Sequence, residues 1–285
     1  MFDYIVVGAG SAGCALAARL SEDPSLRVAL LEAGPPDRNV LIHCPAGLPV
    51  MALTGQSNWG FETVPQRGLD GRRGYQPRGK VLGGSSSINA MIYTRGHPSD
   101  YDQWAAMGNP GWAWDDVLPL FRRAERNEHL RDEWHGSDGP LNVRDLLSPN
   151  PLSRRFVRAG VEAGLVERRD FNGADHEGVG LYQVTQRDGE RFSAAKAYLA
   201  PARGRTNLQV ITHAQATRVL LEGRRAIGVE YRQGGTLQTL RARREVVLSA
   251  GALQSPQLLM LSGIGPAEHL RALGIAVAHD LPGVG

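Results

Sequence analysis

The chain has 285 residues, of which 21% are charged and 42% hydrophobic, and its formal net charge is +3. These values are typical of a soluble globular protein with one large or two ordinary domains, and they argue against a disordered chain. Most of the positive charge comes from arginines scattered along the sequence. No basic stripe forms, so nucleic acid is not an expected partner.

Targeting and redox signals are also absent from the sequence. The two cysteines, Cys14 and Cys44, lack CxxC spacing, so no metal site is expected and a reducing compartment fits best. No secretory leader is visible, and no apolar run approaches the roughly 20 residues that span a bilayer. We therefore expect a cytoplasmic protein. Peripheral contact with the inner membrane stays open.

The first 34 residues have the pattern of a nucleotide-binding βαβ unit. A buried strand is predicted at Tyr4 to Val7, and an Ala- and Leu-rich helix and a second strand follow it. Gly8 permits a tight turn, Gly10 lets the backbone approach a pyrophosphate, and Gly13 lets helix and strand pack closely. The carboxylate of Glu32 can accept a ribose hydroxyl and disfavours a 2′-phosphate. This pattern predicts nucleotide binding but leaves NAD and FAD both open.

The next part of the chain alternates between loop and helix patterns. Residues 35–77 are rich in Pro and Gly and are predicted to form a long ordered excursion, with NWGFETVPQ extended. Helices are predicted within 99–130, with Ser99 and Asp115 as N-caps, and over 151–165. Four aromatic residues are predicted to pack in the core rather than to stack on a substrate: Trp104, Trp112, Trp114 and Phe121.

Between residues 208 and 248 the pattern changes to short β-rich runs. LQVIT, ATRVLLE, AIGVEYR and LQTLRAR are separated by turns, and EVVLSAG then returns to a buried strand. An antiparallel excursion inside an α/β scaffold is therefore predicted. The motif SAGALQSPQLLMLSGIG reads as strand, turn and helix, with Ser255 as N-cap, Pro256 at the first helical position and Gly263 as the left-handed end. Packing on the sheet and ligand contact both remain open for this helix.

The stretch RGKVLGGSSSINAMIYTRG places two glycines and three serines between apolar runs. Surface linkers and cofactor loops both have this composition. Together with VVGAGSAG…LLEAG and GALQSPQLLMLSGIG, in this order, the stretch resembles the glucose-methanol-choline (GMC) family of FAD-dependent oxidoreductases. The resemblance covers essentially the whole chain and is greatest to the choline dehydrogenase and aliphatic alcohol dehydrogenase branch.

The resemblance implies an α/β fold, α+β overall, with a Rossmann-like FAD-binding domain, a partial substrate domain and an antiparallel β excursion. It divides the chain into a first FAD-binding part at 1–150, part of a substrate domain at 151–200, and a second FAD-binding part at 201–285. Some relatives tether FAD through a histidine at the position of Ile88, so noncovalent FAD is predicted here. The predicted cofactor-binding residues are Gly8, Gly10, Ser11, Ala12, Gly13, Glu32, Ala33, Val81, Gly83, Gly84, Ser85, Asn89, Ala90, Met91, Ile92 and Ala216.

The implied activity is oxidation of a primary alcohol to the aldehyde by hydride transfer to flavin N5, with oxygen or a quinone as electron acceptor. No residue of this chain is expected to be catalytic, because the family's histidine pair belongs to a segment beyond Gly285. His97 and His176 are interpreted as lone surface residues. The alternative hypothesis is a catalytically incomplete FAD-binding fragment that exposes apolar strand edges and aggregates. An NAD-dependent dehydrogenase would need a nicotinamide pocket in place of the GGSSSIN loop.

Overall fold

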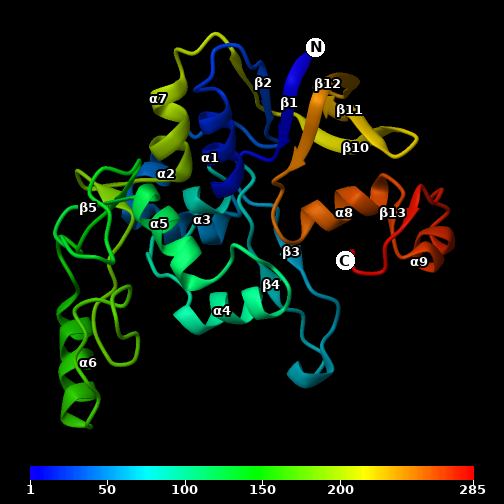
Figure 1. Cartoon of the computed structure of the whole chain (residues 1–285). Helices are drawn as coiled ribbons and strands as arrows, with labels where there is room; N and C mark the ends of the chain where they lie inside the picture. Colours follow the sequence, from blue (N-terminus) through cyan, green and yellow to red (C-terminus); the bar gives the residue numbers. More distant parts are fainter. The chain divides into compact units, whose positions relative to one another are not determined.

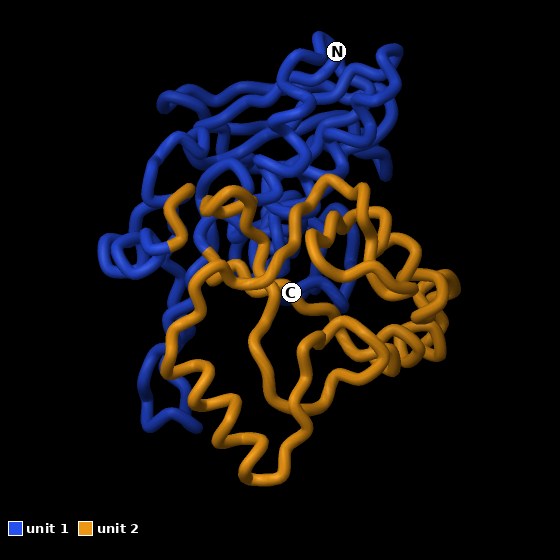
Figure 2. Tube along the Cα trace, turned by 90° about the vertical axis from the view of Figure 1, so that its left-hand side faces the viewer, with its two compact units in different colours: residues 1–42, 46–88, 193–285 blue, residues 43–45, 89–192 orange.

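The computed structural model describes all 285 residues (Figure 1). They form two compact units, which are coloured separately in Figure 2. Unit 1 comprises residues 1–42, 46–88 and 193–285, and unit 2 comprises residues 43–45 and 89–192. The chain therefore passes between the units near residues 88 and 192. The predicted functional division at residues 150 and 200 follows other boundaries and stays a prediction.

Unit 1 is built on a six-stranded sheet in the order β10-β11-β12-β1-β2-β9. The pairs β12–β1, β1–β2 and β2–β9 are parallel, whereas β10–β11 and β11–β12 are antiparallel. This arrangement confirms the predicted α/β class with an antiparallel excursion. The strands are β1 (Phe2–Val7), β2 (Val28–Leu31), β9 (Leu208–Ile211), β10 (Gln215–Glu222), β11 (Arg225–Gln233) and β12 (Thr236–Leu248).

Strand β12 corrects one sequence prediction. LQTLRAR and EVVLSAG, which were expected to form separate strands, are one continuous strand of 13 residues. Its first half pairs with the antiparallel strand β11, and its second half, from Ala242 onward, pairs with the parallel strand β1. The polar run at Arg243 and Arg244 was predicted as a turn, but these exposed side chains form ion pairs with Asp3 of the neighbouring strand β1.

Alternation along β1 and β2 divides the core of unit 1 into two apolar clusters, because successive side chains point to opposite faces of a sheet. Val6 and Leu30 pack in the cluster that contains Cys14 and Ala17 of α1 (Ser11–Leu20). Val7 and Leu31 pack in the other cluster, which contains Leu258 of α8 (Gln254–Leu261). The other α-helices and β-strands of unit 1 are α2 (Val40–His43, whose last residue belongs to unit 2), α3 (Leu48–Thr54), α7 (Ala200–Ala202), α9 (Ala267–Ala272), β3 (Phe61–Glu62), β4 (Tyr75–Gln76), β13 (Ile264–Gly265) and β14 (His279–Asp280).

Helix α8 begins earlier than the sequence predicts. Its N-cap is Leu253, not Ser255, because the backbone of Leu253 is already close to helical. The hydroxyl of Ser255 accepts the Ala250 N–H at 3.1 Å and so closes the turn that precedes the helix. Gly263, with φ +83°, has the left-handed conformation predicted for it.

Unit 2 contains three helices and short paired strands. The N-caps of the first two helices differ from the prediction. His97, not Ser99, caps the first helix, and its Nδ1 accepts the Ser99 N–H at 3.2 Å. Ala113, not Asp115, is the N-cap of the second, and the Ala113 N–H donates to Asp116 Oδ2 at 3.2 Å. The elements are α4 (Pro98–Ala106), α5 (Trp114–Ala124), α6 (Pro151–Glu162), β5 (Glu125–Asn127), β6 (Leu141–Val143), β7 (Gln186–Arg187) and β8 (Glu190–Arg191). No helix in either unit combines the length and apolar character needed to cross a membrane.

The aromatic core of unit 2 is smaller than predicted. Trp114 is buried with Tyr101 and Val117, and Phe121 packs against them. Trp104 and Trp112 are 46% and 51% exposed, so their prediction as core residues is wrong. Each still has a ring neighbour, since Trp104 meets Tyr101 edge-on, with ring centroids 5.4 Å apart, and meets Trp112 at 5.7 Å.

Candidate functional site

A cavity of about 600 Å³ lies in unit 1, at the carboxyl ends of the parallel strands β1, β2 and β12. Val7, Leu31 and Leu248, the last residues of these three strands, all line it. In an open α/β sheet this edge is where ligands bind, because the strand-to-helix loops converge there. The predicted residues that line the cavity are Gly8, Gly10, Ser11, Ala12, Glu32, Ala33, Gly84, Ser85 and Ala216.

The turn between β1 and α1 brings bare backbone to the cavity. Gly8 has φ +97°, and a Cβ there would lie 2.7 Å from the Ser249 carbonyl oxygen, so only glycine fits without strain. A Cβ on Gly13 would overlap the Gly8 carbonyl oxygen, whereas one on Gly10 would meet no atom within 4 Å. No side chain caps the first turn of α1. Its N–H groups and the positive end of the helix dipole are therefore available to an anion.

Glu32 stands at the end of β2 with only 5% of its surface exposed. Its Oε2 accepts the Ala9 N–H at 3.0 Å, and its Oε1 accepts the Gly34 N–H at 2.8 Å. Burial raises the pKa of Glu32 to about 7, although these backbone hydrogen bonds favour the ionised form. Each oxygen keeps a further acceptor site, so the carboxylate can also take a ligand hydroxyl.

The GGSSS loop contacts the β1–α1 turn directly. Gly83 and Gly84 have φ +89° and +54°, and a Cβ on Gly84 would lie 2.7 Å from Gly10 Cα. The Gly83 N–H donates to the Ala9 carbonyl at 2.8 Å. Val81 is fully buried with Ile42 and Met51. Gly84 and Ser85 thus line the cavity. The contacts of Val81, Gly83 and Gly13 are instead within the protein, where they pack the two loops together.

The other predicted cofactor residues, Asn89 to Ile92, belong to unit 2. Asn89, Ala90 and Ile92 are exposed, whereas Met91 is 6% exposed and has φ +64°. None of the four lines the cavity of unit 1. Their contact with a flavin stays a prediction.

Trp59 and Arg78, for which the sequence predicted no role, also line the cavity. The Nζ of Lys80 lies 4.3 Å from the centroid of the Trp59 ring. The sequence signals for them were an aromatic residue inside a Pro- and Gly-rich excursion and an arginine five residues before Gly83.

The turn from Ser249 to Leu253 lines the cavity as well, and so do Ser255, Gln257, Leu258 and Leu261 of helix α8. Leu258 also packs in the core cluster on the sheet. Both interpretations left open for this helix therefore apply, since it packs on the sheet and also faces the cavity.

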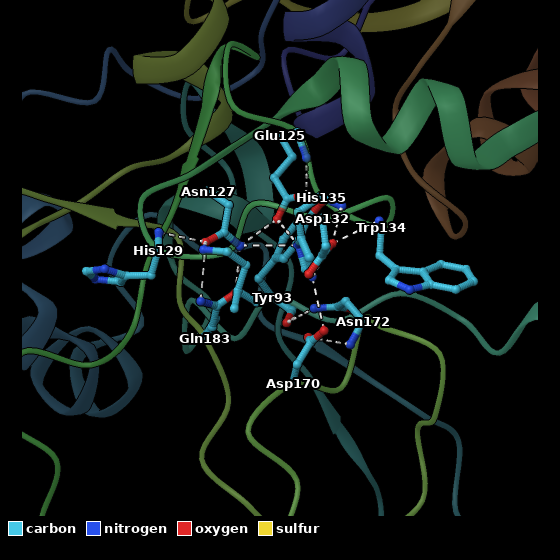
Figure 3. Close-up of polar contacts among 12 residues, drawn as sticks. Tyr93, Glu125, Asn127, His129, Asp132, Trp134, His135, Asp170, Asn172 and Gln183 are labelled. Atoms are coloured by element: carbon cyan, nitrogen blue, oxygen red, sulfur yellow. Dashed lines mark hydrogen bonds and ion pairs between the residues drawn. The ribbon is translucent and has the colours of Figure 1, made fainter.

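Unit 2 holds a buried ionic network centred on His135, shown in Figure 3. His135 Nδ1 lies 3.1 Å from Glu125 Oε1, and its Nε2 lies 3.0 Å from Asp170 Oδ2. Glu125 Oε2 accepts from Arg95 Nη2 at 2.6 Å, and Glu125 Oε1 accepts from the side-chain amide of Asn127 at 2.9 Å. The side chains of Arg95, Glu125 and His135 are 1%, 0% and 0% exposed. These groups tie together distant parts of unit 2.

The network keeps its groups charged despite burial. Desolvation alone would lower the pKa of His135, but hydrogen bonds to Asp170 and Glu125 raise it to about 9. Desolvation likewise opposes ionisation of Glu125 and Asp170, but their hydrogen bonds, to His135 first, bring each pKa below its ordinary value. Since both ring nitrogens of His135 face carboxylates, this histidine is a structural ion and not a poised base.

Comparisons with known proteins agree with this geometry. The family model for the N-terminal part of GMC oxidoreductases matches residues 2–285. Over its full length the chain is 53% identical to an alcohol dehydrogenase [acceptor] from Pseudomonas putida, of which it covers 52%, and 50% identical to the mitochondrial choline dehydrogenase of Homo sapiens, of which it covers 49%. The structure of pyridoxine 4-oxidase from Mesorbium loti superposes with a TM-score of 0.94 at 41% identity, over 99% of this chain and 56% of that one. The chain thus spans about half the length of these relatives.

Proposed function

Because the chain belongs to the GMC oxidoreductase family, we propose that it binds FAD and forms the cofactor-binding part of an oxidoreductase that converts a primary alcohol to the aldehyde. The observation that carries the proposal is the convergence on one cavity of the Gly8–Gly13 turn, Glu32 and the Gly83–Gly84 loop. Solved FAD-dependent oxidoreductases with this fold, such as one from Chaetomium thermophilum with a TM-score of 0.94 at 34% identity, support the same cofactor.

The residues present fit the adenosine diphosphate part of FAD. Gly10 and Gly84 expose backbone where a pyrophosphate would approach, and the uncapped first turn of α1 supplies donors to it. Glu32 accepts ribose hydroxyls. Arg78 lines the same cavity and supplies positive charge close to these groups.

Noncovalent attachment is part of the proposal. Ile88 packs against the apolar cluster of Ile42, Met51 and Val81 and offers no nucleophile to a flavin. When bound, FAD accepts the hydride of the alcohol at N5, so the protein must supply a group that takes the hydroxyl proton. No histidine lines the cavity. We place that proton acceptor in the further half that the relatives possess, which makes a catalytically incomplete fragment the second hypothesis.

The electron acceptor is proposed to be oxygen or a quinone. The oxygen-dependent choline dehydrogenases among the relatives support oxygen, whereas the name alcohol dehydrogenase [acceptor] leaves the acceptor open and is compatible with a quinone. Peripheral contact with the inner membrane also remains a prediction. The reacting alcohol is proposed to be a small molecule of the aliphatic or choline type.

The test is a visible absorption spectrum of the chain, mixed with FAD, desalted and then titrated anaerobically with medium-chain alcohols or choline. A retained flavin spectrum supports the cofactor. Bleaching by alcohol would show that this chain contains its own proton acceptor and would overturn its placement elsewhere. A retained spectrum that does not bleach supports the incomplete fragment. Loss of the flavin on desalting would contradict FAD binding by this chain.

A further inference from the structure

The segment from Asn89 to Met91 is held in a conformation that its residues do not favour by themselves. Met91 is a non-glycine residue with φ +64°, a left-handed backbone that costs on the order of 1 kcal/mol for an L-residue. Its N–H donates to Asn89 Oδ1 at 3.0 Å, and its carbonyl accepts the Thr185 N–H at 2.8 Å. The side-chain oxygen of Asn89 is therefore the local support of this turn.

The buried Arg191 in turn binds two oxygens of Asn89. Arg191 Nη1 donates to the Asn89 carbonyl at 2.7 Å and to Asn89 Oδ1 at 2.9 Å. Arg191 is 0% exposed and belongs to β8 of a two-stranded hairpin with β7. On the same hairpin, the Gln186 side-chain amide lies 3.5 Å from Met91 Sδ. The hairpin thus contacts both ends of the turn.

Burying a guanidinium costs free energy unless hydrogen bonds satisfy it. Burial lowers the pKa of Arg191 to about 10, so the group stays charged at neutral pH. A neutral polar or apolar residue would fill this position at lower cost if only packing were needed. A charged Nη1 makes stronger and more directional hydrogen bonds than a neutral donor, and both that it makes here go to oxygens of Asn89, which they fix in one geometry.

We propose that Arg191 is the positioning residue of the flavin-facing turn Asn89–Met91. It holds the carbonyl and side-chain oxygens of Asn89 so that Met91 keeps its left-handed backbone and the turn presents one fixed surface to the ring. The inference rests on the proposed function, because the flavin contact of this turn is itself part of that proposal. It adds a residue that the cofactor contacts do not include.

The first measurement needs no cofactor. Amide hydrogen exchange is followed by mass spectrometry in the 285-residue chain without FAD, in peptides that contain Met91. Losing a hydrogen bond to a charged donor should accelerate exchange in Arg191→Met by about tenfold or more, and Arg191→Lys should recover part of the protection. The matched control is Arg187→Met on the same hairpin, since the Arg187 side chain is 45% exposed and pairs with Asp188. The control should leave these peptides unchanged.

The second variant guards against a general loss of folding in Arg191→Met. Asn89→Ala removes the oxygen that Met91 and Arg191 share but leaves the arginine its bond to the Asn89 carbonyl. It should accelerate exchange in the same peptides, and adding Arg191→Lys should have little further effect, because the two residues act on one turn. Additive effects of the two changes would contradict the inference.

The second measurement uses the chain with FAD bound. The visible absorption and circular dichroism bands of the flavin should change in Arg191→Met and return toward wild type in Arg191→Lys. The affinity for FAD should stay within about threefold in both variants, because most of the binding energy is assigned to unit 1. Unchanged exchange in a folded Arg191→Met variant, or equal acceleration in the Arg187→Met control, would overturn the positioning role.

The experiments distinguish a failure of the positioning role of Arg191 from a failure of FAD binding by the chain. Accelerated exchange with an unchanged flavin spectrum would show that the turn does not reach the ring, and would overturn the flavin part of the inference. A wild-type chain that retains no flavin contradicts the proposed function, and the flavin part falls with it. The exchange data still decide whether Arg191 positions the turn.

Discussion

The ionic network around His135 predicts a specific dependence of stability on pH. The pKa of His135 rises from 6.5 to about 9 on folding. The His135 side chain is 0% exposed, so solvent screens its interactions with the carboxylates only weakly. A group whose pKa is higher in the folded protein stabilises it fully below the unfolded pKa, and this contribution is lost as the pH rises through the folded pKa. From these two values, the charged imidazole contributes on the order of 2–3 kcal/mol at pH 7 that is gone at pH 10.

The assay is urea unfolding followed by tryptophan fluorescence, with Trp134 next to His135 as a probe in unit 2. His135→Gln should lose on the order of 3 kcal/mol at pH 7, because Glu125 and Asp170 then lack their shared cation. The difference in free energy of unfolding between wild type and this variant should shrink by on the order of 2–3 kcal/mol between pH 7 and pH 10. Other titrating groups contribute equally to the stability of both proteins, so their contributions cancel when the two free energies of unfolding are subtracted.

The matched control is His129→Gln. His129 lies near the network in sequence but its side chain is exposed and points away from it in Figure 3, and only its backbone N–H bonds to Asn127. This variant should keep the wild-type pH profile. If wild type and His135→Gln lost stability in parallel from pH 7 to pH 10, the imidazole would not be charged in the folded chain and the argument would be refuted.

Further predictions concern the cavity of unit 1. Gly13→Ala should destabilise the chain by several kcal/mol, because its Cβ would overlap the Gly8 carbonyl, whereas Gly10→Ala should leave urea stability within about 1 kcal/mol but reduce FAD affinity at least tenfold by equilibrium dialysis. Because folding raises the pKa of Glu32 to about 7, the free energy of unfolding of the FAD-free chain should fall as the pH rises through 7. Ribose hydroxyls should favour the ionised carboxylate, so the affinity for FAD should rise severalfold from pH 6 to pH 8. Glu32→Gln should bind more weakly and show no such rise in dialysis. Acid denaturation should release all flavin into the supernatant, since Ile88 cannot form a bond to it; a coloured pellet would contradict noncovalent binding.

The sequence predicted the nucleotide loop because each part of it follows from local chemistry. Gly8 and Gly13 are required by backbone conflicts that any βαβ turn of this type has, and Glu32 follows at the end of the next strand. Spacing alone therefore located the turn, the helix and the acid. The contact of Gly84 with Gly10 joins residues 74 positions apart, and only the family resemblance indicated that the two loops meet.

Helix starts were predicted less well, because a cap depends on where the incoming chain bends. Ser99 and Ser255 have the residue type of an N-cap, yet each lies inside a helix that begins earlier. The Ser99 N–H is taken by the His97 ring, and the Ser255 hydroxyl closes the preceding turn. A suitable residue type was therefore present near each helix start, but the tertiary path of the chain selected another residue for the cap.

Buried charge is the feature that the sequence concealed most completely. Arg95, Glu125 and Asp170 stand in segments that look like ordinary polar loops and strand ends, and nothing in their spacing predicts a common partner. His135 bonds to Glu125 and Asp170, and Arg95 bonds to Glu125, only because distant segments fold against one another. A buried ion without partners would cost several kcal/mol. Arg191 is a further buried cation of unit 2, and its Nη1 donates to two oxygens of Asn89, 102 positions away in the sequence. The arginines that gave the composition its scattered positive charge thus include two that face no solvent, and their roles become visible only when their buried partners are known.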